Sequence, residues 1–152
     1  MYRQCKLRML GKVVNKIYLS IMQLTTYTDY SLRALLYIGK YPDRLVTVSE
    51  ITDHYGVSRN HMVKVIHNLG AHGFIQTVRG KSGGMRLAKK PQEILIADVV
   101  RLTEPHMNIQ ECFSRETNTC PLIDNCKLMG VLYRARQAFM QVLEAQSLAD
   151  IL

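Results

Sequence analysis

Three cysteines near one another are the residues of this 152-residue chain best suited to hold a metal. Seven residues separate Cys112 from Cys120, and five separate Cys120 from Cys126. Thiolates are soft ligands for zinc and iron–sulfur clusters, and they also form disulfides. Zinc knuckles favour cysteine pairs two to four residues apart, a spacing that is absent here. Spacing alone favours an iron–sulfur site only slightly over a zinc site. A thiol–disulfide switch and uncoordinated thiols are the other two interpretations of these cysteines.

A second set of residues is suited to bind DNA. From Ser58 to Leu69 the apolar side chains fall on one helical face, and polar or basic ones fall on the opposite face or at the helix start. Arg and Lys contact guanine or phosphate, Asn contacts adenine, and helix-start N–H groups can hold a phosphate. Gly80, Gly83 and Gly84 follow in a basic turn that suits backbone or minor-groove contacts. The candidate DNA-contacting residues are Ser58, Arg59, Asn60, His61, Lys64, His67, Arg79 and Lys81.

The same pattern also fits a solvent-facing helix next to a surface hairpin, because every soluble helix has a polar face. DNA binding is favoured because the helix, the preceding turn and the basic hairpin occur together. The formal net charge of +8 also favours a polyanionic partner. However, residues 1–21 contain five of the basic residues and no acidic residue, so part of this charge lies outside the candidate interface.

Three helices are predicted before the basic hairpin. The first runs from Thr28, a candidate N-cap, to about Lys40. Thr47 and Glu50 have the spacing of a capping box and open a second, short helix. A glycine turn then leads to the helix at 58–70, and this order is typical of a helix-turn-helix.

The rest of the chain predicts a hairpin, a loop and a long helix. Strands at 74–78 and 85–87 would form a wing, and a short helix follows at 94–102. An irregular loop at 104–121 carries two of the cysteines. Apolar residues recur three or four apart over 121–146, which predicts a long amphipathic helix of a kind that often forms a dimer interface. The expected fold is mainly α with a small β-hairpin wing: a winged helix-turn-helix followed by a long C-terminal dimerisation helix.

The chain is expected to divide into three parts. Residues 1–21 are expected to be an N-terminal extension outside the fold, with translation normally beginning at Met22. Residues 22–90 would form the winged helix-turn-helix DNA-binding domain, and residues 91–152 the cluster-binding loop and dimerisation helix.

Composition and motifs also bound the function. With 47% hydrophobic residues, the chain can form a packed core. It contains no apolar run near the roughly 20 residues that span a bilayer, and no recognisable secretory signal. We therefore expect a cytoplasmic protein with reduced thiols and no membrane partner. It contains no paired acid–base motif, nucleotide-binding loop or nucleophile–histidine arrangement, so we expect no catalytic residues and no enzyme.

Several phrases of the sequence resemble a known family of regulators. They are MQLTTYTDYSLRALLY at 22–37, YGVSRNHMVKVI at 55–66, VRGKSGGMRL at 78–87, SLADIL at 147–152 and the three cysteines. These phrases are similar to the NsrR-like nitric-oxide-sensing repressors, whose family of winged-helix regulators also includes the IscR-like iron–sulfur regulators. The resemblance covers all residues after the first 21.

This resemblance implies a homodimeric repressor that binds a double-stranded DNA operator. The affinity of the repressor for this operator would depend on a bound iron–sulfur cluster, 4Fe–4S or 2Fe–2S, and nitric oxide would be the signal that reacts with the cluster. By the same resemblance, Cys112, Cys120 and Cys126 are ligands, and Asp29 is the fourth ligand, offered by the opposite subunit. Without it, a carboxylate stabilised by the helix dipole is the simpler interpretation of Asp29.

The sequence also distinguishes between branches of this family. IscR-like proteins have a histidine three positions after the last cysteine, where this chain has Met129. That difference favours the NsrR-like branch. An IscR-like sensor of cluster supply or redox state, and a zinc- or thiol-based redox switch, are the alternatives.

Overall fold

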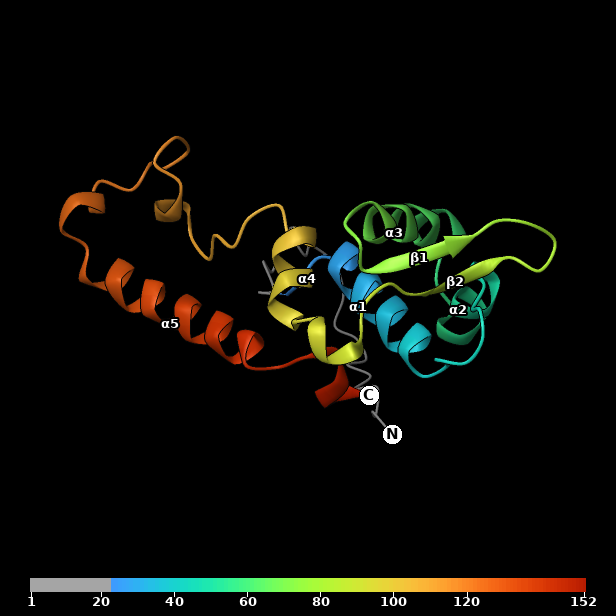
Figure 1. Ribbon diagram of the computed structural model, residues 1–152. Coiled ribbons are helices and arrows are strands. Elements are labelled where there is room, and N and C mark those ends of the chain that lie inside the picture. Colours follow the sequence, from blue (N-terminus) through green and yellow to red (C-terminus); the bar gives the residue numbers. More distant parts are fainter. Residues whose placement is uncertain (1–22) are drawn as a thin grey trace, which may run out of the picture.

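The computed structural model describes residues 23–152 as a mainly helical chain with one antiparallel hairpin (Figure 1). The expected extension at 1–21 lies outside the described residues. The helices are α1 (Thr26–Gly39), α2 (Val48–Tyr55), α3 (Arg59–Ala71), α4 (Ile96–Thr103) and α5 (Lys127–Glu144), and the strands are β1 (Ile75–Val78) and β2 (Gly84–Leu87). The expected fold class, mainly α with a β-hairpin wing, is confirmed. None of the helices in this part of the chain combines the length and apolar character needed to cross a bilayer.

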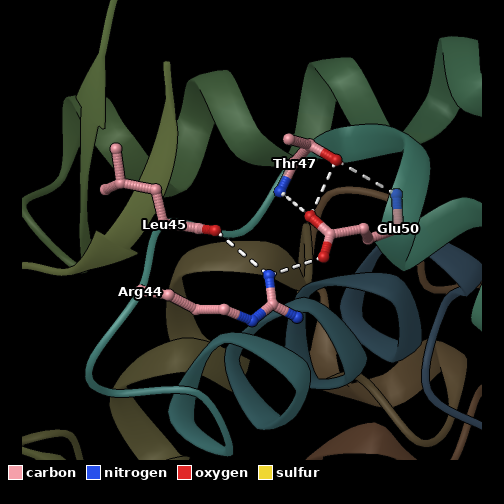
Figure 2. Close-up of polar contacts among 4 residues, drawn as sticks. All are labelled: Arg44, Leu45, Thr47 and Glu50. Atoms are coloured by element: carbon pink, nitrogen blue, oxygen red, sulfur yellow. Dashed lines mark hydrogen bonds and ion pairs between the residues drawn. The ribbon is translucent and has the colours of Figure 1, made fainter. Parts of the chain in front are cut away.

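The expected capping box fixes the start of α2 (Figure 2). The Glu50 carboxylate accepts hydrogen bonds from the Thr47 backbone N–H (2.7 Å) and hydroxyl (2.9 Å), and the Thr47 hydroxyl accepts one from the Glu50 N–H (3.3 Å). Arg44 donates to the second carboxylate oxygen at 2.6 Å and to the Leu45 carbonyl at 3.2 Å. The helix ends at Gly56, whose φ of 64° suits a residue without a Cβ. The turn at Gly56 leads into α3.

Two helix boundaries before the hairpin differ from the sequence prediction. The N-cap of α1 is Thr25, whose hydroxyl accepts from the Thr28 N–H at 3.3 Å, so α1 begins before the expected cap. Thr28 is fully buried in the first turn. Ser58 occupies the N-cap position of α3 but makes no side-chain cap hydrogen bond. That helix continues one residue beyond Gly70, because the left-handed residue that follows it is Gly73 (φ 71°).

One hydrophobic core joins the first four helices, the hairpin and the C-terminal turn. Leu35 of α1, Leu69 of α3, Val99 of α4 and Leu148 of the last turn are all fully buried. The C-terminal turn is held beside α4 by backbone hydrogen bonds from Leu148 N–H to the Ile94 carbonyl and from Ile96 N–H to the Gln146 carbonyl. The chain end therefore closes the core around α1.

The loop after α4 and helix α5 lie outside this core. In Figure 1, α5 extends to one side of the other helices. It begins at Lys127, later than predicted, because a 3₁₀ turn at Ile123–Asn125 precedes it. No residue of α5 is buried in the single chain. Its large exposed apolar side chains are Leu128, Val131, Tyr133, Phe139 and Val142.

Candidate DNA interface and metal centre

Helix α3 separates its four buried apolar side chains from the candidate DNA-contacting ones, while Val63 is 47% exposed. The side chains of Met62, Val65, Ile66 and Leu69 are buried against α1 and the other core elements. All eight candidates from the sequence are exposed, namely Ser58, Arg59, Asn60, His61, Lys64, His67, Arg79 and Lys81. The helix thus presents a polar face that is free to meet a ligand.

Contacts that the sequence did not predict fix parts of this face. Arg59 donates to the hydroxyl of Ser49 in the first turn of α2, at 2.7 Å. On the other side, the Tyr27 hydroxyl of α1 donates to the Lys64 backbone carbonyl at 3.4 Å. The Tyr30 ring lies near the His61 ring, with centroids 6.4 Å apart. The polar face of α3 is therefore held by both α1 and α2.

The hairpin places the other two basic candidates in the turn between its strands, where Arg79 and Lys81 are exposed. The strands pair in the register Gln76↔Arg86, and Arg86 donates to the Gln76 side chain at 3.1 Å. Gly83 is required at the turn, because a Cβ there would lie 2.3 Å from the Val78 carbonyl oxygen. The wing is thus a tight basic hairpin beside α3.

The three cysteines lie on the segment that connects α4 to α5. Cys112 is in a 3₁₀ turn, Cys120 follows in the loop, and Cys126 is the N-cap of α5. All three are free thiols of intermediate exposure. The Cys126 sulfur accepts a hydrogen bond from the Met129 N–H at 3.4 Å. Within residues 23–152, however, no three His, Cys, Asp or Glu side chains come together as a metal site.

Polar and cation–π contacts give this loop internal order. The Glu111 carboxylate, next to Cys112, accepts from the N–H (3.2 Å) and hydroxyl (2.9 Å) of Thr119, which precedes Cys120. The Arg136 guanidinium of α5 lies 4.9 Å from the ring centroids of both Phe113 and Tyr133. These contacts tie the segments of the three cysteines to one another and to α5.

One polar atom in the loop lacks a partner. Asn118 donates through its side-chain NH₂ to the Cys120 carbonyl at 3.0 Å, but its buried side-chain oxygen accepts no hydrogen bond. Buried polar atoms in native proteins almost always have a partner, often water or a bound ligand. This oxygen, beside Cys120, is therefore available to accept a hydrogen bond from water or a bound group.

Asp29, the candidate fourth ligand, lies in the first turn of α1, and it is not grouped with the loop cysteines of the same chain. Both of its oxygens contact Arg33: Nε donates to Oδ1 at 2.9 Å, and Nη2 lies 2.9 Å from Oδ2. The two side chains are about 40% exposed. Asp29 also lines a surface hollow of about 390 Å³ with Gln23, Leu24, Thr26 and Leu32. The carboxylate thus lies at the surface, where it is paired with Arg33.

A further contact joins the start of the cysteine loop to the start of α1. Glu104, the C-cap of α4, accepts from the Thr25 backbone N–H at 2.7 Å and from its hydroxyl at 3.1 Å. The two residues are 79 positions apart in the sequence. No local signal in the sequence indicated this contact.

A helix-turn-helix followed by a basic hairpin is the architecture of winged-helix DNA-binding proteins. Residues 24–152 match the Rrf2 family, described as an iron-dependent transcriptional regulator. The chain belongs to this family, and it is a DNA-binding transcriptional regulator, not an enzyme.

Relatives support this assignment along most of the chain. The HTH-type transcriptional regulator NsrR of Shouchella clausii is 51% identical over 131 residues, which cover 86% of this chain and 88% of that protein. NsrR of Bacillus licheniformis is 46% identical over 132 residues, covering 86% and 92%. The expected resemblance to NsrR-like regulators is therefore confirmed.

Solved structures show the same fold at low identity. T. potens IscR has a TM-score of 0.69 at 21% identity, covering 86% of this chain and 85% of that one. CymR, the global cysteine regulator of B. subtilis, has a TM-score of 0.70 at 21% identity, covering 86% and 96%. At this identity the likeness shows the fold alone.

Proposed function

We propose that this regulator is a repressor whose operator affinity depends on a bound iron–sulfur cluster that reacts with nitric oxide. The observation that carries the proposal is the set of three free, half-exposed cysteines on one loop of an Rrf2-family chain. Relatives named NsrR, at 44–51% identity, favour this choice within the family. The cluster type, 4Fe–4S or 2Fe–2S, is left open.

The donor set fits such a cluster. Cys112, Cys120 and Cys126 supply three soft thiolates, and Cys126 also receives a backbone N–H, a type of contact that tunes iron–sulfur centres. By the resemblance to NsrR-like repressors, the fourth ligand would be Asp29 of the partner subunit. A bound cluster supplies iron that reacts with nitric oxide.

Asp29 can connect this site to DNA because it belongs to α1, which packs against α3. As a ligand, Asp29 would have to give up part of its contact with Arg33. Without the cluster, Asp29 would keep that ion pair, and the start of α1 would not be held by the partner subunit. A ligand shifts an equilibrium only when its contacts differ between the two states, and this exchange of partners is such a difference.

The DNA-binding surface would consist of α3 and the wing. Arg59, Asn60, His61, Lys64 and His67, with Ser58 at the helix start, would enter the major groove. Arg79 and Lys81 would contact the backbone or minor groove. In a homodimer the two α3 helices would read half-sites about one helical turn, roughly 34 Å, apart.

The second copy would pack on α5. Its exposed apolar side chains need cover in water, and two pairs of them, Leu128 with Val131 and Phe139 with Val142, have the three-residue spacing that brings side chains to one side of a helix. The functional division would then fall as the sequence predicts, with 22–90 binding DNA and 91–152 holding the cluster and the partner.

Anaerobic purification tests the proposal directly. The wild-type protein should be coloured and contain iron and sulfide, and exposure to nitric oxide should weaken its operator binding in a gel shift. Single Ala substitutions of Cys112, Cys120 and Cys126 should each abolish the cluster but leave the helical content. Cys5→Ala, the matched control outside the loop, should keep it. Colourless, iron-free protein that still binds its operator fully would overturn the proposal.

The same samples distinguish the alternatives. A zinc- or thiol-based switch would be colourless, and its operator affinity would follow zinc or oxidant. An IscR-like sensor would hold a cluster but respond to chelators or oxygen more strongly than to nitric oxide.

A further inference from the structure

The first turn of α1 lies between the cysteine loop and the DNA-reading helix. On one side, Glu104 begins the segment that carries all three cysteines, and its carboxylate binds the N-cap residue Thr25 through two hydrogen bonds of 2.7 and 3.1 Å. These bonds are partly buried. The start of α1 is therefore attached to the start of the loop in the same subunit.

On its other side, α1 is attached to α3. The Tyr27 hydroxyl donates to the Lys64 carbonyl, and the Tyr30 ring lies near the His61 ring. Farther along α1, Ala34 and Leu35 share a fully buried core with the apolar face of α3. A movement at the start of α1 must therefore shift or strain α3, since packed interiors have few alternative arrangements. Both Lys64 and His61 carry candidate DNA-contacting side chains.

We propose that Glu104 couples the state of the cysteine loop to the position of α3, through its two hydrogen bonds to Thr25. This inference rests on the proposed function, because it assumes that the loop has cluster-bound and cluster-free states. Glu104 is a positioning residue that touches neither metal nor DNA. Asp29 lies one turn after Thr25. The first turn of α1 would therefore be contacted both by Glu104 of its own subunit and, through Asp29, by the proposed cluster of the partner subunit.

The chemistry of this contact suits a coupling role. The Thr25 hydroxyl already caps α1 through the Thr28 N–H, so Glu104 is not needed to begin the helix. What Glu104 adds is a carboxylate at the positive end of α1, bonded to an N–H and an O–H. Such a charge-assisted contact is strong and directional, and it is lost when the loop start moves by a few ångströms.

The measured quantity is the ratio of operator Kd without the cluster to operator Kd with it, in the full chain. We compare wild type with Glu104→Ala, which removes both bonds, and Glu104→Gln, which keeps an acceptor oxygen but loses the charge. Thr25→Ser keeps both donors. Glu93→Ala is the matched control, because Glu93 also accepts a backbone N–H, from Lys90, but precedes α4. Thermal unfolding of each variant shows that it is folded.

Glu104→Ala should reduce the ratio roughly tenfold, the scale of one charge-assisted hydrogen bond. Glu104→Gln should reduce it less, and Thr25→Ser and Glu93→Ala should leave it near the wild-type value. If Glu104→Ala does not fold, a Glu104→Gln ratio equal to that of wild type overturns the proposal. A wild-type ratio near one means instead that the proposed function has failed.

A second readout uses the cluster-free protein. Glu104→Ala should speed amide hydrogen exchange at the start of α1 and in α3, while Glu93→Ala should not. Faster exchange confined to the loop, with α1 and α3 unchanged, would show that Glu104 merely orders its own segment and would overturn the coupling.

Discussion

The two parts of this chain differ in how much of their structure one subunit can complete. From α1 to α4, apolar side chains fill a closed core, and the C-terminal turn returns to seal it. From Glu104 to α5, the chain is held by local contacts, and α5 buries no residue of its own. The proposed DNA-binding surface, α3 and the wing, is thus folded within a single chain, whereas the proposed sensing site requires a metal and a second copy.

This difference predicts that the two parts contribute unequally to the stability of the protein. A packed core sets the global free energy of unfolding, whereas a segment with few buried contacts opens at lower cost. Signals that act on the loop and α5 can therefore change structure without unfolding the DNA-binding part.

The largest expected effect is a core substitution. Leu35 is fully buried, and Leu35→Ala should destabilise the protein by about 3–4 kcal/mol through lost burial and a residual cavity. Leu122→Ala is the control, because that side chain lies in the loop and is 64% exposed. Denaturant unfolding followed by circular dichroism measures both. Equal destabilisation by the two would show that the loop belongs to the same cooperative core.

A substitution on α5 should weaken dimerisation without destabilising the subunit. Val142 is 64% exposed in the single chain, so Val142→Glu should leave the subunit folded but weaken dimerisation by roughly 100-fold, because it buries a charge in the proposed interface. Gln137→Glu adds the same charge five residues earlier, on a different side of the helix, and is the control. Sedimentation equilibrium gives the dissociation constants. An unchanged dimer would remove α5 from the interface.

Local sequence signals predicted the DNA-binding part well. The capping box, the glycine turn at Gly56 and the apolar spacing of α3 each depend on residues within a few positions of one another. The boundary error at α1 arose because Thr25 and Thr28 are both good N-cap residues, and only the structure shows that Thr25 accepts the capping hydrogen bond while Thr28 is buried.

The contacts around the candidate site could not be predicted in the same way. Glu104 meets Thr25 across 79 positions, and Arg59 reaches Ser49 in another helix. Such pairs depend on how helices pack, which no periodicity encodes. The cysteines were proposed as ligands from residue type and spacing, whereas the proposed role of Asp29 came from family resemblance, because the structure of one chain holds no contact between subunits.

Loss of a basic side chain from the reading surface should have a smaller, DNA-specific effect. Lys64→Ala and Arg79→Ala should each weaken operator binding about tenfold and make the slope of log K against log salt shallower by about 0.9 per lost phosphate contact. Stability should not change, because both side chains are exposed. Arg115→Ala, an exposed loop position, controls for net charge. If affinity and slope survive both substitutions, the reading surface is wrongly assigned.

The smallest expected effect lies in the cap of α2, inside the compact part. Hydrogen bonds from the Thr47 N–H, and then from its hydroxyl and from Arg44, hold the pKa of Glu50 below its ordinary value. A carboxyl with a depressed folded-state pKa adds stability above its unfolded pKa, and this contribution disappears as pH falls through the folded value. Glu50→Gln should therefore cost about 0.5–1 kcal/mol at neutral pH and progressively less in acid, since Gln still accepts in the capping box. The measurement is the free energy of unfolding of wild type and of Glu50→Gln as a function of pH. A difference between the two that stays constant into acid would show that the charge of Glu50 contributes nothing to stability. The acid sensitivity of the compact part would then have another source.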